Sequence, residues 1–276
     1  MKIKREQVCL YTPVYSNRSS AEEIIERAAR HGVGGVELMN FCEELSTPDR
    51  AAAVRLGKQA RANGLRIPCF SAAADIAADP GVVESLFRYA EICAELEIPY
   101  LHHTIAMNLQ GYGMTEGERE ETFLRCVEPV LRICDYAASL GVRTLIEDQG
   151  FVFNGKENCL RLCALSGGRI GIVADTGNIL FYDERPEDFI RAAGTRVCHA
   201  HVKDYCFSPT PYGEGECYQT RLGAYLRDEE LGHGCIDFVA VKQAFAEIGY
   251  AGMYAMELAS AKEAAEVDRA IDFLCS

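Results

Sequence analysis

Three carboxylates and one imidazole stand at or near the ends of four successive apolar segments in the second half of the chain. The segments are V-R-T-L-I-E, I-G-I-V-A-D, R-V-C-H-A-H and G-M-Y-A-M-E, and they deliver Glu147, Asp175, His201 and Glu257. Three converging carboxylates would repel one another, and burying them without a partner is unfavourable. A divalent ion resolves that conflict. Oxygen ligands with a single imidazole favour Mn²⁺, with Mg²⁺ and Co²⁺ as alternatives and Zn²⁺ less suited. For any one carboxylate the competing role is a helix N-cap or a loop salt bridge.

The segment 197–205, V-C-H-A-H-V-K-D-Y, begins as a strand. His199 and His201 are two residues apart and therefore face the same side. His201 lies at the end of the strand, where a site would form. We expect His199 to lie one layer deeper, as a hydrogen-bonded histidine of the core. The polar pair Lys203-Asp204 follows, and then a long loop over 205–233 without helical periodicity. Loops of this length in a compact domain are usually functional, so we expect a lid or a subunit contact.

The elements that must position these residues repeat one unit: a short apolar strand, a loop and an amphipathic helix. No G-x-G-x-x-G motif follows a strand, so a closed barrel is favoured over an open doubly wound sheet. The sequence predicts one (β/α)₈ TIM barrel of the α/β class, as a single domain over residues 1–276. The predicted strands are 7–11, 35–39, 65–71, 99–104, 142–147, 170–175, 196–201 and 252–257. The predicted helices end near residues 31, 63, 97, 139, 165, 193, 248 and 274, the last one starting at Ala261.

The amino-acid composition argues against several classes of partner and location. With 28 Lys and Arg against 41 Asp and Glu, the formal net charge of −13 argues against a nucleic-acid partner. It gives no support for an anionic membrane partner. No apolar run approaches about 20 residues and the N-terminus lacks a signal-like apolar region, so we expect neither a membrane span nor export. The 13 cysteines are scattered and never spaced C-x-x-C. They are typical of small apolar side chains in a cytoplasmic, reducing environment.

Five motifs resemble those of the xylose-isomerase-like TIM barrels: I-E-D-Q (146–149), V-A-D-T-G-N (173–178), H-A-H-V-K-D (199–204), G-H-G-C-I-D-F (232–238) and G-Y-A-G-M-Y-A-M-E (249–257). Within that group the chain is similar to the sugar phosphate isomerase/epimerase branch, whose relatives are tagatose/psicose 3-epimerases, hydroxypyruvate isomerases and inosose dehydratases. The resemblance implies that Glu147, Asp175, His201 and Glu257 bind one divalent metal ion. It also implies that Glu147 and Glu257 serve as the catalytic acid/base pair.

That arrangement suits a metal-dependent enzyme that abstracts a proton next to a carbonyl and stabilises the resulting enediolate. We therefore predict a sugar isomerase or epimerase acting on a small carbohydrate. One alternative is a dehydratase, or lyase, of a keto-inositol or related keto sugar. A second is a non-catalytic barrel that binds a sugar or a partner. Asn178 stands where the 3-epimerases usually carry a histidine, and strand 142–147 is followed by Asp-Gln rather than the usual asparagine or histidine. Endonuclease IV relatives, with three zinc ions and many histidines, fit poorly.

Six further residues are candidates for substrate contact. Lys203 and Asp204 would orient substrate oxygens, with a rim salt bridge as the alternative. His103 would reach the site from the end of strand 99–104, while its neighbour packs outward. Glu37 would bond a substrate hydroxyl or brace a lysine or arginine. Asn178 and Arg221, the latter inside the long loop, complete the set. Aromatic loops indicate a homodimer or homotetramer without deciding between them.

Overall fold

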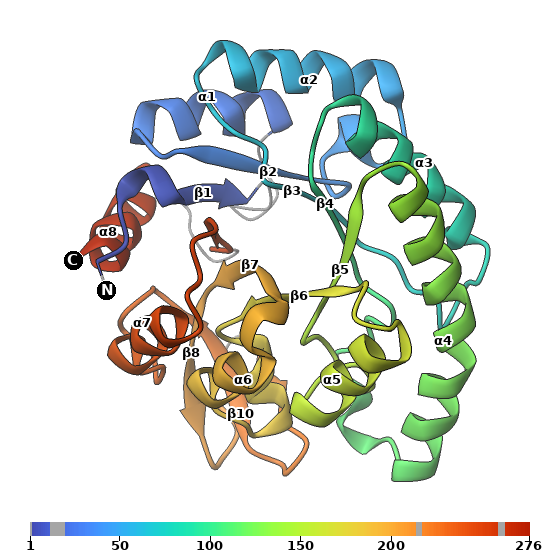
Figure 1. Cartoon of the computed structure of the whole chain (residues 1–276). Helices are drawn as coiled ribbons and strands as arrows, with labels where there is room; N and C mark the ends of the chain where they lie inside the picture. Colours follow the sequence, from blue (N-terminus) through green and yellow to red (C-terminus); the bar gives the residue numbers. More distant parts are fainter. Residues whose placement is uncertain (1, 12–19, 214–216, 259–262) are drawn as a thin grey trace.

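Eight strands that are almost wholly buried close into a parallel barrel, and eight helices surround it (Figure 1). The computed structural model describes residues 2–11, 20–213, 217–258 and 263–276, and all counts refer to those residues. Around the barrel the order is β1-β11-β7-β6-β5-β4-β3-β2. The strands are β1 Val8–Tyr11, β2 Gly35–Met39, β3 Cys69–Ala72, β4 Tyr100–His103, β5 Arg143–Glu147, β6 Gly171–Asp175, β7 Val197–Val202 and β11 Tyr254–Met256. This confirms the predicted (β/α)₈ barrel.

The helices form the outer ring in chain order, from α1 and α2 beside β2 to α7 and α8 near the two chain ends (Figure 1). They are α1 Ala21–His31, α2 Arg50–Ala62, α3 Val82–Glu95, α4 Glu116–Ser139, α5 Lys156–Leu165, α6 Pro186–Ala193, α7 Phe238–Glu247 and α8 Ala264–Cys275. Short 3₁₀ turns cover Arg5–Gln7, Glu43–Leu45, Gly111–Gly113, Asn178–Tyr182 and Gly194–Arg196. The predicted start of the last helix at Ala261 lies outside the described residues.

Local side-chain capping sets several helix starts. Ser20 and Thr115 each accept a hydrogen bond from the backbone N–H three residues on, and the glutamate at that position bonds back to the cap. Asp49 and Asp237 each accept from two backbone N–H groups of the first helical turn. These caps satisfy donors that have no partner inside a helix. The helices therefore start at fixed positions.

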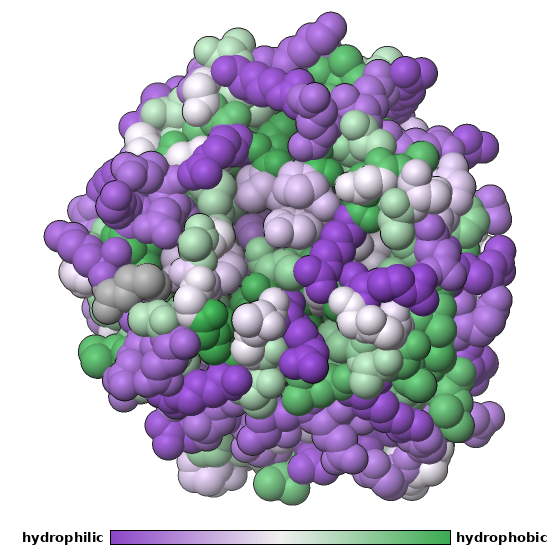
Figure 2. Space-filling model, in the orientation of Figure 1, coloured by the Kyte–Doolittle hydropathy of each residue, from purple (hydrophilic) through white to green (hydrophobic). Residues whose placement is uncertain are grey.

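The barrel strands are buried on both faces, one against the helices and one against the barrel interior. On the surface, hydrophilic residues dominate the outer rim of the face in Figure 2, and paler, less hydrophilic residues gather toward its centre. Among the described residues, no helix combines the length and the apolar character that crossing a bilayer requires.

The long loop predicted over 205–233 is not a loop throughout, and in this respect the prediction is wrong. It contains a separate antiparallel sheet of β8 Asp204–Ser208, β9 Tyr218–Gln219 and β10 Tyr225–Glu229, in the order β8-β10-β9. The sheet packs against the barrel through a hydrophobic cluster of three aromatic residues and one leucine: Phe151, Phe181, Tyr205 and Leu226. The strands escaped prediction because they are short and only partly buried, which leaves no clear alternation of apolar and polar residues.

Asp204 joins this small sheet to the end of β7. Its side chain is buried, and its carboxylate accepts hydrogen bonds from the backbone N–H groups of Tyr205, Gly232, Gly234 and Ile236 at 2.9–3.3 Å. Gly234 is required for this approach, because a Cβ there would lie 2.2 Å from Asp204 Oδ1. The carboxylate therefore holds the 232–236 turn in place and has no free lone pair facing the barrel mouth. This geometry gives no support to the predicted substrate contact by Asp204.

We expect Asp204→Ala to lower the free energy of unfolding by about 3 kcal/mol, because four backbone donors lose a charged acceptor. Gly234→Ala should destabilise the same turn by displacing the carboxylate. Urea denaturation followed by circular dichroism measures both. Asp188→Ala, at an exposed aspartate of α6, is the matched control and should change stability by less than about 1 kcal/mol. Equal losses in Asp204→Ala and the control would contradict this role.

Candidate functional site

The four residues predicted to bind a metal meet at one end of the barrel, and we call them the mouth cluster. Its members are Glu147, Asp175, His201 and Glu257. Each offers one ligand atom, and these four atoms lie within 4.8 Å of one another. His201 Nδ1 lies 2.7 Å from Glu147 Oε1 and 3.2 Å from Glu257 Oε2. Residues separated by more than a hundred positions in the sequence therefore form one compact group.

The parallel register of the strands brings the mouth cluster together. Asp175, the last residue of β6, is paired with His201 of β7, and His201 is paired with Ala255 of β11. Glu257 directly follows β11, where its backbone N–H donates to Val202 O at 3.0 Å. Neighbouring strands thus end at similar heights, and their terminal side chains converge on the barrel mouth, where such barrels place their active sites.

Asp175 is oriented by its own turn. Its Oδ1 accepts the backbone N–H groups of Gly177 and Asn178, both at 2.7 Å, and Asp148 Oδ1 accepts the Asp175 N–H at 2.9 Å. Asp175 Oδ2 is buried and accepts no hydrogen bond. One oxygen of this carboxylate is therefore committed to the backbone. The other is presented to the cluster.

Lys203 supplies positive charge directly beside the mouth cluster. Its ammonium Nζ lies 2.7 Å from Glu257 Oε1 and 3.2 Å from Asp175 Oδ2, and it donates to Asn178 Oδ1 at 3.2 Å. Burial would lower the pKa of Lys203, but Asp175 and Glu257 raise it well above its usual value. The ammonium therefore stays charged. Two predicted substrate-binding residues, Lys203 and Asn178, lie at the site.

The charges of the cluster remain unbalanced even with Lys203 present. Burial raises the pKa of Asp175 to about 7 despite the attraction of Lys203, and the carboxylates of Glu147 and Glu257 add to the rise. Burial also opposes ionisation of Glu257, but Lys203 and His201 lower its pKa to about 2. A carboxylate that is only half ionised near neutral pH, with one oxygen contacted only by the Lys203 ammonium at 3.2 Å, fits an additional cation. The residues present are therefore suited to a divalent metal ion.

The histidine pair on β4 is arranged opposite to the prediction. His102, not His103, faces the barrel interior, with Nε2 3.7 Å from Glu147 Oε2 and Nδ1 2.7 Å from Ser71 Oγ. His103 is fully buried, and its Nδ1 lies 3.2 Å from Thr104 O. Burial lowers the pKa of His103 to about 4. Strand alternation allows only one of two adjacent side chains to point inward, and the register of β4 with β3 selects His102.

For Arg221 and Glu37 the structure shows contacts with other side chains of the protein. The Arg221 guanidinium is 4.9 Å from the ring centroid of Tyr182, and the residue is exposed. Glu37 is fully buried and bonds two histidines rather than a lysine or arginine: His199 Nε2 at 2.6 Å and His201 Nε2 at 3.1 Å. This confirms the expectation that His199 is a hydrogen-bonded core histidine.

The layer formed by Glu37, Ser71, His102 and His199 beneath the mouth cluster was mostly missed by sequence reasoning. One signal was available, because Glu37 is a carboxylate in the middle of the apolar strand G-V-E-L-M. Such a residue must find a buried partner. Which partner it finds depends on β3, β4 and β7, and the sequence does not show their register.

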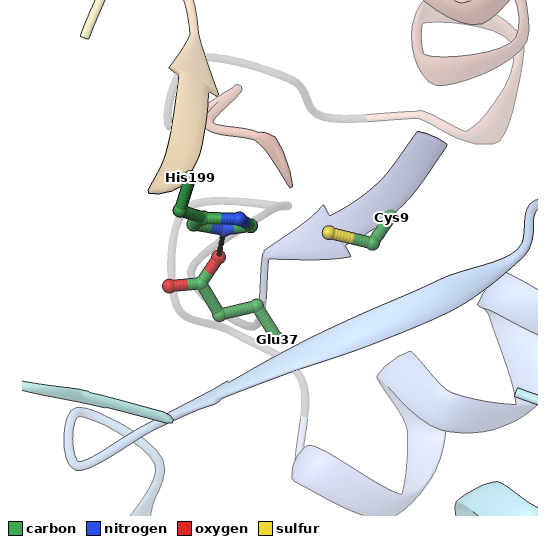
Figure 3. A group of neighbouring side chains, drawn as sticks. All are labelled: Cys9, Glu37 and His199. Carbon is green, nitrogen blue, oxygen red and sulfur yellow. Dashed lines mark hydrogen bonds and ion pairs between the residues drawn. The ribbon is translucent and has the colours of Figure 1, made fainter. Parts of the chain in front are cut away.

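Two further groups could be considered as metal sites, and both include Glu37. Cys9, Glu37 and His199 lie together, with the thiol of β1 facing the ion pair of the other two (Figure 3). Burial and the charge of Glu37 raise the pKa of the Cys9 thiol well above its usual value, so the thiol carries its proton in this structure. Glu37, His102 and His201 form the other group, but there Glu37 Oε1 already accepts from Ser71 Oγ at 2.5 Å. The mouth cluster is the better donor set.

Comparisons with known proteins agree with this architecture. A model of the xylose isomerase-like TIM barrel family matches residues 25–276, which confirms the resemblance inferred from the motifs. A search of curated protein sequences finds no match.

Solved structures of similar fold include enzymes named for different reactions. D-psicose 3-epimerase with D-tagatose from Clostridium cellulolyticum H10 aligns with TM-score 0.72 and 15% identity, over 99% of this chain and 98% of that one. The 3-keto-D-glucoside 4-epimerase from E. coli aligns with TM-score 0.76 and 12% identity, over 97% of this chain and 98% of that one. The probable 3-DHS dehydratase from Bacillus anthracis aligns with TM-score 0.74 and 16% identity, over 98% of this chain and 99% of that one. At these identities the likeness shows the fold alone.

The raised pKa of Asp175 generates a pH prediction for the metal-free protein. A folded pKa of about 7 against an ordinary 3.8 means that the folded state binds this proton more tightly. The contribution of Asp175 to stability is then favourable below pH 3.8 and is lost as pH rises through about 7. The stability difference between wild type and Asp175→Asn should fall over that range, by up to about 4 kcal/mol. Urea denaturation in chelator measures it, and a flat difference would contradict it.

Proposed function

Because the chain belongs to the xylose isomerase-like TIM barrel family, we propose that it is a divalent-metal-dependent isomerase or epimerase acting on a small ketose or polyol-like sugar. One observation carries the proposal: the ligand atoms of the mouth cluster lie within 4.8 Å of one another at the carboxyl ends of adjacent strands. Three carboxylates and one imidazole suit Mn²⁺ best, followed by Mg²⁺ and Co²⁺. The epimerases of similar fold support a carbohydrate substrate.

The proposed chemistry is proton transfer next to a carbonyl. When bound, a divalent ion supplies positive charge that stabilises an enediolate. Glu147 and Glu257 come from separate strands and reach the same nitrogen of His201, at 2.7 and 3.2 Å. One glutamate removes the proton and the other returns one to the opposite face, which epimerises the carbon. Return to the neighbouring carbon interconverts an aldose and a ketose.

Lys203 and Asn178 are proposed to contact the substrate oxygens. The ammonium of Lys203 keeps Glu257 ionised, because it lies 2.7 Å from Glu257 Oε1 and contributes to its low pKa. An ionised Glu257 can accept a proton from carbon. Asn178 holds the ammonium in this position through its side-chain oxygen at 3.2 Å. The same ammonium can donate to a hydroxyl or carbonyl oxygen of the sugar.

A second candidate function is dehydration of a keto sugar or keto acid, and Lys203 is the observation that favours it. Loss of a β-hydroxyl from an enediolate needs a proton for the leaving oxygen. The ammonium of Lys203 lies 2.7 Å from Glu257 Oε1, so Glu257 can pass the proton that it took from carbon to the leaving oxygen while Lys203 donates a hydrogen bond to that oxygen. A dehydratase is among the proteins of similar fold. Dehydration produces a conjugated enone that absorbs in the ultraviolet, whereas epimerisation produces no such chromophore.

Solvent exchange tests the proposed proton transfer. We expect the Mn²⁺-loaded protein in D₂O to place deuterium on a carbon next to the carbonyl of at least one member of a panel of ketopentoses, ketohexoses, 3-keto-glucosides and keto-inositols. Nuclear magnetic resonance detects the label, and ultraviolet absorbance detects the enone. Tight binding of a sugar with neither signal would indicate a non-catalytic barrel instead.

Glu257→Gln should lower kcat about 10²- to 10⁴-fold, because an amide cannot accept the proton. Metal content, measured by atomic emission, must accompany the rate, since Glu257 is also a proposed ligand. Glu187→Gln, at a buried glutamate of α6 paired with Arg185, is the matched control and should keep the wild-type rate. Full activity in Glu257→Gln would overturn the acid/base role.

Removal of the metal should abolish turnover reversibly. Dialysis against a chelator is expected to reduce activity to background, and Mn²⁺ or Co²⁺ should restore it. The melting temperature should rise on reloading, because a ligand that binds only the folded state stabilises it. Undiminished activity in protein shown to be metal-free would rule out the proposed mechanism.

A further inference from the structure

Glu37 lies at the centre of the barrel interior with no solvent exposure, directly beneath the mouth cluster. Figure 3 shows it joined to His199 of β7, with Cys9 of β1 alongside. Its carboxylate has three close partners. Oε2 contacts His199 Nε2 at 2.6 Å, and Oε1 contacts His201 Nε2 at 3.1 Å. Ser71 Oγ donates to Oε1 at 2.5 Å. A fully buried carboxylate with these contacts has no room for a substrate hydroxyl.

These contacts belong to a closed loop of side chains that returns to the mouth cluster. From Glu37 the loop passes to Ser71, whose Oγ lies 2.7 Å from His102 Nδ1. His102 Nε2 lies 3.7 Å from Glu147 Oε2. Glu147 Oε1 is 2.7 Å from His201 Nδ1, and His201 Nε2 leads back to Glu37. One buried carboxylate is therefore connected to the metal-ligating face of His201 by two routes.

The contacts of Glu37 determine which nitrogen of each imidazole carries a proton. Its Oε1 accepts the hydroxyl proton of Ser71, and its two oxygens lie within hydrogen-bond distance of His199 Nε2 and His201 Nε2. A carboxylate that bonds a hydroxyl and two imidazoles at once acts as their acceptor, so each imidazole places an N–H on the Nε2 that faces it. For His201 this leaves Nδ1, on the opposite side of the ring, directed at the mouth cluster.

We infer that Glu37 is a positioning residue that fixes the ring orientation of His201 and directs its Nδ1 at the metal site. The inference rests on the proposed function for the identity of the ion, but not for the hydrogen-bond geometry. Metal-ligating histidines commonly donate their second ring N–H to a carboxylate, which fixes the ring and increases its basicity. The second contact, to His199 one layer below, anchors Glu37 itself. The role predicted from the sequence, a bond to a substrate hydroxyl, is replaced by this one.

Glu37→Gln tests the inference, because the amide keeps the shape of the side chain but cannot accept from both histidines. Isothermal titration of the metal-free, folded variant with Mn²⁺ should show binding about 10- to 100-fold weaker than wild type. Glu187→Gln serves again as the control for placing an amide in the protein interior, and it should bind like wild type. A folded Glu37→Gln variant with wild-type Mn²⁺ affinity would overturn the inference.

A second measurement needs no variant at position 37 and no metal. In wild-type protein labelled with ¹⁵N at its six histidines, ring N–H correlations should place a proton on Nε2 of both His199 and His201. Single His→Gln variants would assign the signals. An unprotonated Nε2 on His201 would overturn the inference even if Glu37→Gln fails to fold. If wild type binds no divalent ion, the proposed function fails, and this spectrum still decides the role of Glu37.

Discussion

Repulsion among buried carboxylates is the constraint around which this barrel is organised. Parallel strands that end at one height bring their last side chains together, and here three of those side chains are acidic. The protein compensates part of that charge with the ammonium of Lys203 and with His201. Of the three carboxylates in the cluster, Asp175 is the least stabilised as an anion, since its pKa is raised to about 7. A site with this residual negative charge is suited to a divalent cation, whose binding would stabilise the folded protein.

The interior has two layers with different exposure. In the upper layer, the side chain of Glu257 is 21% exposed, which leaves it accessible to a ligand entering from the mouth. In the lower layer, Glu37, Ser71 and His199 are completely buried. Because its members are buried and Glu37 is hydrogen-bonded to both Ser71 and His199, rearranging the lower layer costs free energy, and the layer holds His201 above it in one geometry. Such preorganisation is what an electrostatic mechanism requires.

The edge of the mouth is built from a different kind of structure. The β8-β10-β9 sheet and the turn bound by Asp204 rise from the end of β7, directly after Lys203. Proteins of similar fold include two epimerases and a dehydratase, so the barrel itself does not determine the reaction. Loops on a rigid scaffold usually carry specificity. The small sheet is attached to the barrel by Asp204 and lies beside the mouth, so its residues are placed where they could select the substrate.

The amino-acid sequence by itself determined the order of strands and helices, several helix starts and the four residues of the mouth cluster. These features are local: apolar period, capping residues and a polar residue at the end of an apolar run. Only the tertiary structure decided which of His102 and His103 faces inward, that Asp204 binds a turn, and that 205–233 contains a sheet. It also decided the partners of Glu37, since His199 lies 162 positions away in the sequence. Strand register sets these contacts, and a shift of one residue turns every side chain to the other face.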